Sequence, residues 1–294
     1  MWNSVLITGG PGAFGTAFAR RLLAGPWDAS TEKRHLRRIA LFSRGEFRQY
    51  QCRQELEPLD KQNRLRWFIG DVRDRDRLRR AMEGIDIVVH AAALKRIEVG
   101  QYNPVEVVKT NVDGAINVIE AAQDAGVKRV VALSSDKAFE PVSPYGFSKA
   151  MAESLFLAAN GTTGWTGPRF AVCRYGNVWR STGSVVPTWE ALKAQGATEV
   201  PVTHPECTRF FMRMDEAVDL VLQAIAAEDV SKLFIPRLPA YRLGDLADAM
   251  GLRMKVIGLP PWEKMHEGMG VGNTSDRARR MAMKELKVAL REPT

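Results

Sequence analysis

The sequence predicts an α/β fold: a doubly wound, Rossmann-type parallel sheet followed by a small C-terminal lobe. Short β-branched or apolar runs alternate with longer helical patterns through the first half of the 294-residue chain. This alternation is typical of right-handed βαβ units in a parallel sheet. Most of the expected strands are nearly continuous apolar runs, which indicates strands buried on both faces. A hydrophobic content of 45% suits one large domain of this kind.

The expected elements follow one another regularly up to residue 174. Strands are expected at residues 4–8, 38–42, 65–69, 85–90, 129–133 and 170–174. Helices are expected between them at residues 14–24, 46–57, 75–82, 104–125 and 144–159. Residues 1–174 should therefore form the sheet-based core.

After residue 174 the rhythm is less regular. Helices are expected at residues 186–195, 215–227, 243–250 and 276–290, with short strands at 200–203 and 232–235. We interpret residues 175–294 as a small lobe that does not fold independently.

Composition favours a cytoplasmic protein without a membrane span. No basic leader with an apolar run and a cleavage site precedes the first strand. No apolar stretch approaches the roughly 18 residues that a spanning helix needs. The three cysteines, Cys52, Cys173 and Cys207, are widely spaced and odd in number, which favours reduced thiols. The histidines form no pair at metal-binding spacing, so we expect no metal site.

The chain carries a formal net charge of +8. This charge fits a solvated basic surface, or the attraction of a polyanion such as a dinucleotide phosphate, a nucleoside-diphosphate sugar or nucleic acid. The basic clusters at residues 73–80 and 277–280 lack the interleaved aromatic residues of a single-strand-binding surface. Nucleic acid is therefore the least favoured of these partners.

A glycine-rich turn follows the first expected strand. Gly9, Gly12 and Gly15 are spaced three residues apart, and Ala13 and Phe14 open the following helical pattern. Glycines let the backbone approach a pyrophosphate, and the helix N-terminus supplies free amide donors. This position, after a strand and before a helix, favours dinucleotide binding over a plain tight turn.

The end of the second strand favours NADP over NAD. A carboxylate at this position would bind a ribose 2′-hydroxyl and repel a 2′-phosphate. Ser43 and Arg44 stand there instead, with Arg48 one helical turn later. Because a guanidinium suits a phosphate, we predict an NADP site.

A catalytic pattern follows the fifth expected strand. Ser135 lies at the strand end, and Tyr145 and Lys149 occupy positions i and i+4 of a helical pattern, on one face. We expect the Lys149 ammonium to lower the pKa of the Tyr145 phenol, which makes it a general base. Ser135 can then hold a substrate hydroxyl.

The adjacent pair Asp136 and Lys137 indicates an elimination. A simple ketone–alcohol oxidoreductase needs no further acid and base there. An elimination needs one group that takes a proton from carbon and another that protonates the leaving hydroxyl. The alternative is that the pair forms only a salt bridge in a loop.

With these motifs the chain resembles the UDP-N-acetylglucosamine 4,6-dehydratases, which are extended short-chain dehydrogenases/reductases. The resemblance covers residues 4–267 and is greatest to the inverting members, which keep a tyrosine at the position of Tyr145. Beyond the glycine turn and the Tyr145–Lys149 pair, it rests on residues 43–46, 70–74, 90–95, 135–137, 174–178 and 208–211.

The resemblance implies a lyase with NADP as a bound cofactor and a UDP-N-acetylhexosamine, UDP-GlcNAc above all, as substrate. Tyr145 would deprotonate the sugar 4-hydroxyl while hydride leaves C4. Lys137 would then abstract H5, Asp136 would protonate the departing 6-hydroxyl, and the hydride would return to C6. The product would be a 4-keto-6-deoxy sugar; C5 retention or inversion stays open.

The resemblance also implies binding roles. Asp71 and Val72 would flank the adenine. The cofactor site would further be lined by Ala91, Lys95 and Thr110. The C-terminal lobe would mainly bind substrate, with contacts from Lys95, Asn177, Ser184, Thr203, Arg209 and Glu263. A homo-oligomer, a dimer or an assembly of dimers, is also implied.

Two arginines of the family pattern are replaced here, by Thr182 and Pro260. Arg180 could compensate from a shifted position, and Trp262 could stack on a base or fill space. Two alternatives remain: a nucleotide-sugar 4-epimerase or 4-reductase on the same fold, and a non-catalytic protein that senses NADP or binds nucleic acid. The Asp136–Lys137 pair disfavours the first, and the complete catalytic set disfavours the second.

Overall fold

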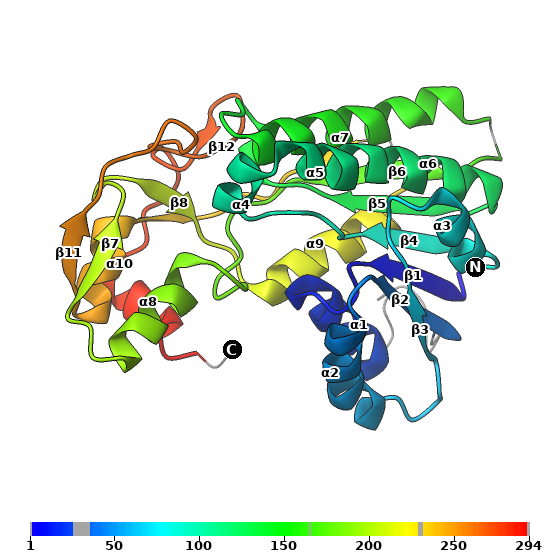
Figure 1. Cartoon of the computed structure of the whole chain (residues 1–294), viewed down its shortest axis with the longest axis horizontal. Helices are drawn as coiled ribbons and strands as arrows, with labels where there is room; N and C mark the ends of the chain where they lie inside the picture. The colour runs from blue at the N-terminus through cyan, green and yellow to red at the C-terminus, as the bar shows by residue number, and fades with distance from the viewer. Residues whose placement is uncertain (1, 26–35, 165, 229–231, 293–294) are drawn as a thin grey trace.

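The computed structural model describes residues 2–25, 36–164, 166–228 and 232–292. Its centre is a seven-stranded sheet in the order β3-β2-β1-β4-β5-β6-β9, and every neighbouring pair is parallel (Figure 1). The strands are β1 (Ser4–Thr8), β2 (Arg38–Ser43), β3 (Leu65–Ile69), β4 (Ile87–His90), β5 (Arg129–Leu133), β6 (Arg169–Cys173) and β9 (Leu233–Phe234). The order reverses between β1 and β4, so the sheet is doubly wound.

Helices cover both faces of this sheet (Figure 1). One face carries α1 (Ala13–Ala24), α2 (Glu46–Leu56) with the 3-10 turn Glu57–Leu59, and α9 (Met214–Ala226). The other carries α3 (Arg75–Met82), α6 (Gly114–Asp124) and α7 (Pro144–Thr162). Side chains alternate along β1: Val5 and Ile7 belong to the first core and Leu6 to the second. Both faces of the strand are apolar because both are covered.

The chain is helical over nearly all of the expected range 104–125, but this helix contains an irregular turn that was not predicted. The structure has α4 (Ile97–Tyr102), α5 (Pro104–Val108), a π-helical turn Lys109–Asp113 and then α6. The apolar periodicity of the sequence does not reveal this π-turn. A π-turn inserts one residue into a helix and is frequent at functional sites. Here it contains Thr110 and Asn111, both of which are buried.

In its described residues, the C-terminal lobe contains three two-stranded sheets. Its elements are α8 (Val185–Ala194), β7 (Glu199–Val202), β8 (Thr208–Phe210), β10 (Ala240–Arg242), α10 (Leu243–Met250), β11 (Arg253–Val256), β12 (Gly268–Gly270), β13 (Asn273–Thr274) and α11 (Met283–Ala289). Trp179, Trp189 and Phe211 are among the residues of its separate core. Two later elements, α9 and β9, pack in the main sheet layer.

The last helix is shorter than expected. It begins at Met283, not near residue 276, because the preceding segment pairs with β10: Ala240 N donates to Arg279 O (2.9 Å) and Met281 N to Ala240 O (2.9 Å). Those backbone groups are therefore not available to a helix. Within the described ranges, no helix combines the length and apolar character needed to cross a bilayer.

Candidate active site

The turn after β1 brings backbone close to backbone. Gly9 has φ +70°, and its amide donates to Phe42 O at 2.8 Å. A Cβ on Gly9 would lie 2.9 Å from Ala92 N, and one on Gly15 would lie 2.4 Å from Gly10 O. Only glycine fits such distances, so the turn requires the residues that the sequence pattern singled out.

Helix α1 starts directly from this turn. Gly12 is its N-cap and offers no side chain as a cap, while Ala13 and Phe14 form the first turn. A helix N-terminus without a side-chain cap leaves amide donors and a positive dipole end for an anion. The residues present therefore fit the pyrophosphate of a dinucleotide.

Charged side chains lie beside the end of β2. The Ser43 hydroxyl contacts the Gln49 amide nitrogen at 3.0 Å. Arg44 Nη1 lies 3.7 Å from Asp71 Oδ2, and Arg73 binds the same oxygen at 2.7 Å. Although burial opposes it, these guanidinium groups lower the pKa of Asp71. Arg48 is exposed on α2, one turn further on.

Asn111, a residue that sequence reasoning missed, connects the segment after β4 to α7 through hydrogen bonds. Its side-chain oxygen accepts from Leu94 N (2.8 Å), and its nitrogen donates to Leu94 O (3.0 Å) and Ser148 Oγ (2.9 Å). The neighbouring Thr110 is buried, and its hydroxyl has no hydrogen-bond partner. An orphaned buried hydroxyl is costly unless a ligand satisfies it. The π-turn thus supports the predicted cofactor role of Thr110.

The remaining predicted cofactor residues lie around this turn. Ala91 N donates to Thr8 O at 3.1 Å, which continues the β1–β4 ladder by one residue. The Val72 side chain is buried. Partial burial and the neighbouring Arg96 lower the pKa of Lys95.

On the reaction side, the structure brings Ser135, Asp136, Lys137 and Tyr145 together. A 3-10 turn, Asp136–Ala138, follows β5 and carries Asp136 and Lys137, with Ser135 as its N-cap. Ser135 Oγ donates to Asp136 Oδ1 at 2.7 Å, and Lys137 Nζ contacts the same oxygen at 3.2 Å. Tyr145, in the first turn of α7, interacts with Ser135 and Lys137.

Burial sets the protonation of this group. It raises the pKa of Asp136, and it raises the pKa of Tyr145 although Lys137 and Ser135 act in the opposite sense. Lys149 instead donates to Leu133 O, and burial lowers its pKa to about 8. The predicted lowering of the Tyr145 pKa by Lys149 is therefore not found: burial dominates, and the nearby cation is Lys137.

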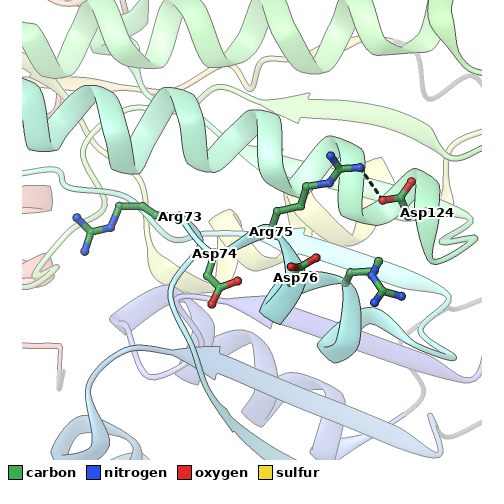
Figure 2. Close-up of a pocket in the computed structure, with 6 residues that line it drawn as sticks. Arg73, Asp74, Arg75, Asp76 and Asp124 are labelled. Carbon is green, nitrogen blue, oxygen red and sulfur yellow. Dashed lines mark hydrogen bonds and ion pairs between the residues drawn. The ribbon is translucent and has the colours of Figure 1, made fainter.

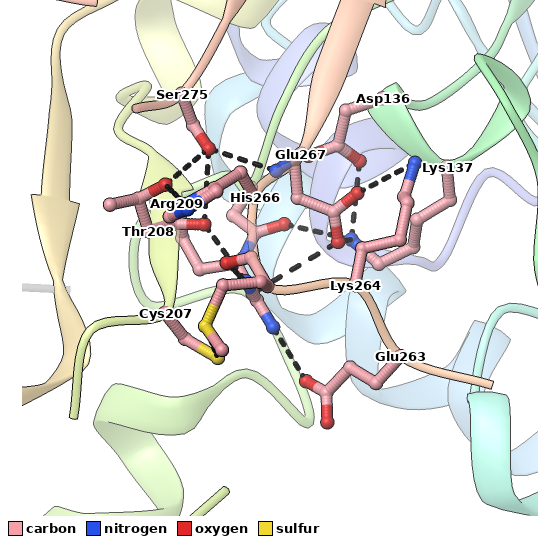
Figure 3. A network of polar contacts seen from close by, with 12 residues as sticks. Asp136, Lys137, Cys207, Thr208, Arg209, Glu263, Lys264, His266, Glu267 and Ser275 are labelled. Carbon is pink, nitrogen blue, oxygen red and sulfur yellow. Dashed lines mark hydrogen bonds and ion pairs between the residues drawn. The ribbon is translucent and has the colours of Figure 1, made fainter. Parts of the chain in front are cut away.

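A second buried carboxylate, Glu267, faces Lys137 from the C-terminal lobe (Figure 3). Glu267 Oε1 lies 3.3 Å from Lys137 Nζ, and Oε2 lies 3.2 Å from Lys264 Nζ. Arg209 Nε is 4.0 Å from Oε1. Sequence reasoning missed Glu267 and Lys264, because nothing in the sequence pairs residues 263–267 with the turn after β5.

The predicted substrate residues of the lobe contact one another or the catalytic group. Lys137 Nζ donates to Asn177 Oδ1 at 3.2 Å. Tyr241, which sequence reasoning also missed, interacts with Asn177. Arg209 is buried and pairs with Glu263 at 2.8 Å.

Two further predicted contacts lie nearer the surface of the lobe. Thr203 Oγ1 lies 3.8 Å from Cys207 Sγ. Ser184 is the N-cap of α8, and its buried hydroxyl has no hydrogen-bond partner.

Arg180 does not replace the missing family arginines. Its guanidinium binds Glu190 at 2.7 Å and Leu290 O at 2.6 Å, so it ties α8 to the end of the chain. The compensation considered for Arg180 is therefore wrong. Thr182 is exposed, and Trp262 lines a small cavity beside Lys137.

A shallow depression beside α3 and the end of α6 holds none of the predicted site residues (Figure 2). It is lined by Arg73, Asp74, Arg75, Asp76, Arg79 and Asp124. Arg75 binds Asp124 at 2.8 Å and Glu120 at 2.9 Å. The basic cluster at residues 73–80 is thus partly neutralised by acidic partners, as on a solvated surface.

Comparison with known proteins places this site in a family. The family described as "Polysaccharide biosynthesis protein" matches residues 5–288. The chain belongs to this family. It is 42% identical over 269 residues to the "UDP-N-acetylglucosamine 4,6-dehydratase (inverting)" of Campylobacter jejuni subsp. jejuni serotype O:23/36 (strain 81-176), covering 91% of this chain and 77% of the relative. The resemblance found in the sequence is thereby confirmed.

Another relative carries a different activity in its name. The chain is 37% identical over 273 residues to the "UDP-glucose 4-epimerase" of Rickettsia akari (strain Hartford), covering 91% of this chain and 77% of the relative. Family membership alone therefore does not separate dehydration from epimerisation.

Solved structures confirm the predicted fold. Pen from Bacillus thuringiensis matches with a TM-score of 0.88 and 31% identity, over 97% of this chain and 95% of that chain. The dTDP-glucose 4,6-dehydratase DesIV from Streptomyces venezuelae, with NAD bound, matches with a TM-score of 0.80 and 22% identity, over 98% and 96%.

Proposed function

We propose that this protein is an NADP-dependent UDP-N-acetylhexosamine 4,6-dehydratase that acts on UDP-GlcNAc. One observation carries the proposal: Asp136, fully buried and with a raised pKa, lies against Lys137 in the group that contains Tyr145. A 4-epimerase needs no acid beyond its tyrosine, whereas a dehydratase needs one to expel the 6-hydroxyl as water. The identity to the Campylobacter dehydratase supports the same reaction.

The residues divide the work as follows. Tyr145 takes the proton of the sugar 4-hydroxyl, which Ser135 holds by hydrogen bonding. A nicotinamide cofactor, held by the glycine turn and the start of α1, would supply the redox chemistry: hydride removal from C4 and hydride delivery to C6. The 4-keto group acidifies H5, and the elimination then needs one base that removes H5 and one acid that protonates the 6-hydroxyl. Asp136 and Lys137 supply them.

One proton shift prepares that pair. Although burial opposes it, Asp136 and Glu267 raise the pKa of Lys137, so its side chain is an ammonium before reaction. Transfer of one proton across the 3.2 Å contact to Asp136 Oδ1 makes Lys137 a base and Asp136 an acid at once. The amine then removes H5, and the carboxylic acid protonates the departing 6-hydroxyl. The remaining oxygen, Asp136 Oδ2, is buried and has no hydrogen-bond partner among the described residues.

The product distinguishes the two candidate reactions. With UDP-GlcNAc as substrate, we expect mass spectrometry to show a product lighter by one water and NMR to show a new methyl group. A product of unchanged mass with inverted configuration at C4 would show that this protein is a 4-epimerase, the activity for which the Rickettsia relative is named. Unchanged substrate with retained NADP would favour a sensing role.

A nicotinamide cofactor suits the fold, and we propose NADP in particular. Support comes from Ser43 and Arg44, which occupy the strand end where a carboxylate would reject a 2′-phosphate. Asp71 lies 3.7 Å from Arg44 but is already bound by Arg73. Residues 1–174 would hold this cofactor, and residues 175–294 would mainly hold the UDP-sugar.

We further propose a cytoplasmic homodimer. The three cysteines are free, which supports a reducing compartment. Two adjacent elements, α5 and α7, expose apolar side chains, among them Val105 (62% exposed), Phe147 (60%) and Met151 (53%). Helix pairs of this kind suit a two-fold contact with a second copy. Phe147→Glu should convert the dimer to a monomer in size-exclusion chromatography with light scattering; an unchanged dimer would place the contact elsewhere.

A further inference from the structure

Glu267 is buried among three cations. Its side chain is 1% exposed, and Lys137, Lys264 and Arg209 surround it. A carboxylate removed from water is tolerated only when such partners compensate the lost hydration. Although burial opposes it, these cations lower the pKa of Glu267 to about 2. Glu267 is therefore negatively charged at neutral pH.

The backbone around Glu267 is held in place. Its amide donates to Ser275 Oγ (2.9 Å), and Ser275 N donates to Glu267 O (2.8 Å). Lys264 Nζ also donates to Phe139 O at 2.8 Å, which joins the lobe to the segment after the catalytic turn. A Cβ on Gly268 would lie 2.6 Å from the Phe139 ring. The Glu267 carboxylate is thus fixed relative to Lys137 by contacts on both sides.

The position of this charge affects both members of the catalytic pair. Lys137 Nζ lies almost equally far from Asp136 Oδ1 (3.2 Å) and Glu267 Oε1 (3.3 Å). The Glu267 charge adds to the effect of burial in raising the pKa of Asp136, and it raises the pKa of Lys137. Without Glu267, the ammonium would pair with Asp136 alone and hold it in the ionised form.

We propose that Glu267 is a positioning residue of the reaction: it shares the Lys137 ammonium with Asp136, so that Asp136 can accept that proton and pass it to the leaving hydroxyl. This inference rests on the proposed dehydratase function and deepens it. The step stays balanced, because one proton moves from Lys137 to Asp136 and then to the departing oxygen. Glu267 gains and loses none.

The test is the pH profile of kcat for Glu267→Gln, which removes the charge and keeps the size. Removing a negative charge lowers the pKa of both Lys137 and Asp136, so the shared proton is lost at lower pH. We expect the alkaline limb to move down by about one pH unit or more, as for a charge removed within about 4 Å. We also expect kcat to fall about 10- to 100-fold, which is less than the full rate contribution of a general acid–base group, and KM to stay nearly unchanged.

Two variants serve as controls. Glu267→Asp keeps the charge and should restore most of the alkaline limb. Glu206→Gln removes an exposed carboxylate of the same lobe, 3.0 Å from Arg242, and should leave the profile as in the wild type. A folded Glu267→Gln enzyme with the wild-type limb would overturn the proposal.

Lys264→Gln carries the test if Glu267→Gln does not fold. Without the Lys264 cation, the Glu267 charge is compensated mainly by Lys137, so the pKa of Lys137 rises. The alkaline limb should then move to higher pH, opposite to the shift expected for Glu267→Gln. An unmoved limb would again overturn the proposal. The two inferences can be told apart. A wild-type enzyme that forms no dehydrated product would contradict the proposed function. A wild-type enzyme that forms this product, with variants whose alkaline limbs do not move, would contradict only the role of Glu267.

Discussion

The glycine turn after β1 and the charged cluster after β5 lie at the same edge of the sheet, yet they are built differently. The turn is one short stretch, Gly9 to Gly15, and its fit depends on backbone distances that exclude a Cβ. The cluster consists of buried charges from segments that are far apart in the sequence, such as Asp136 and Glu267. The comparison teaches that a backbone-built site is visible as spacing in a sequence, whereas a site built from distant charges is not.

The two regions should also respond differently to mutation. In the turn, an added methyl group displaces backbone, so the cost falls on ligand binding and on stability together. In the cluster, each charge is compensated by its neighbours, so removing one changes the protonation of the others. The following changes separate these effects, beginning with the largest.

Lys137→Ala should block elimination while the fold and cofactor binding survive. General acid–base groups contribute about 10²- to 10⁴-fold, so kcat should fall within that range. The fall should appear in product formation measured by mass spectrometry, and circular dichroism should show an intact fold. Undiminished product would remove Lys137 from its role.

Gly15→Ala should damage the other region. Its new Cβ would meet Gly10 O at 2.4 Å, and overpacking of this kind costs about 1–3 kcal/mol, or roughly 10- to 100-fold in affinity. Calorimetric titration with NADP and a thermal melt should both show the loss. Gly161→Ala is the matched control: its Cβ meets no atom within 4 Å, so it should be neutral or slightly stabilising. Equal behaviour of the two variants would contradict the close-approach argument.

Arg44→Ala should have the smallest effect and a selective one. Hydrogen bonds to charged groups contribute about 1.5–3 kcal/mol, but Arg44 is half exposed and partly screened. We expect NADP affinity to fall about 10-fold and NAD affinity to stay constant, as measured by titration with each cofactor. An equal loss for both would assign Arg44 to general phosphate attraction, and a wild-type preference for NAD would contradict the NADP proposal.

Much of the sheet could be predicted because it depends on local pattern. The apolar runs that became β1 and β5 were placed to the residue, since burial on both faces leaves few polar positions. The helix expected at residues 104–125 was placed to within one residue, but the π-turn inside it was not predicted, because a single inserted residue leaves little trace in the apolar pattern. The start of the last helix was predicted wrongly, because residues 279–281 pair with β10 although their sequence has a helical pattern.

The site was predictable only where its chemistry is local. Asp136, Lys137 and Tyr145 follow one strand, and the fold necessarily brings them together. The pKa of Tyr145 was not predictable, because burial outweighs the charges around it. Glu267 and Tyr241 reach the same place through the packing of the C-terminal lobe, which no spacing in the sequence reports.

The fate of a labelled hydrogen tests the central claim most directly. Substrate should be UDP-GlcNAc carrying deuterium at C4, with products followed by NMR and mass spectrometry. The proposed mechanism predicts that the deuterium moves to the C6 methyl group of a product that has lost one water. Deuterium that stays at C4 in a product of unchanged mass would contradict it.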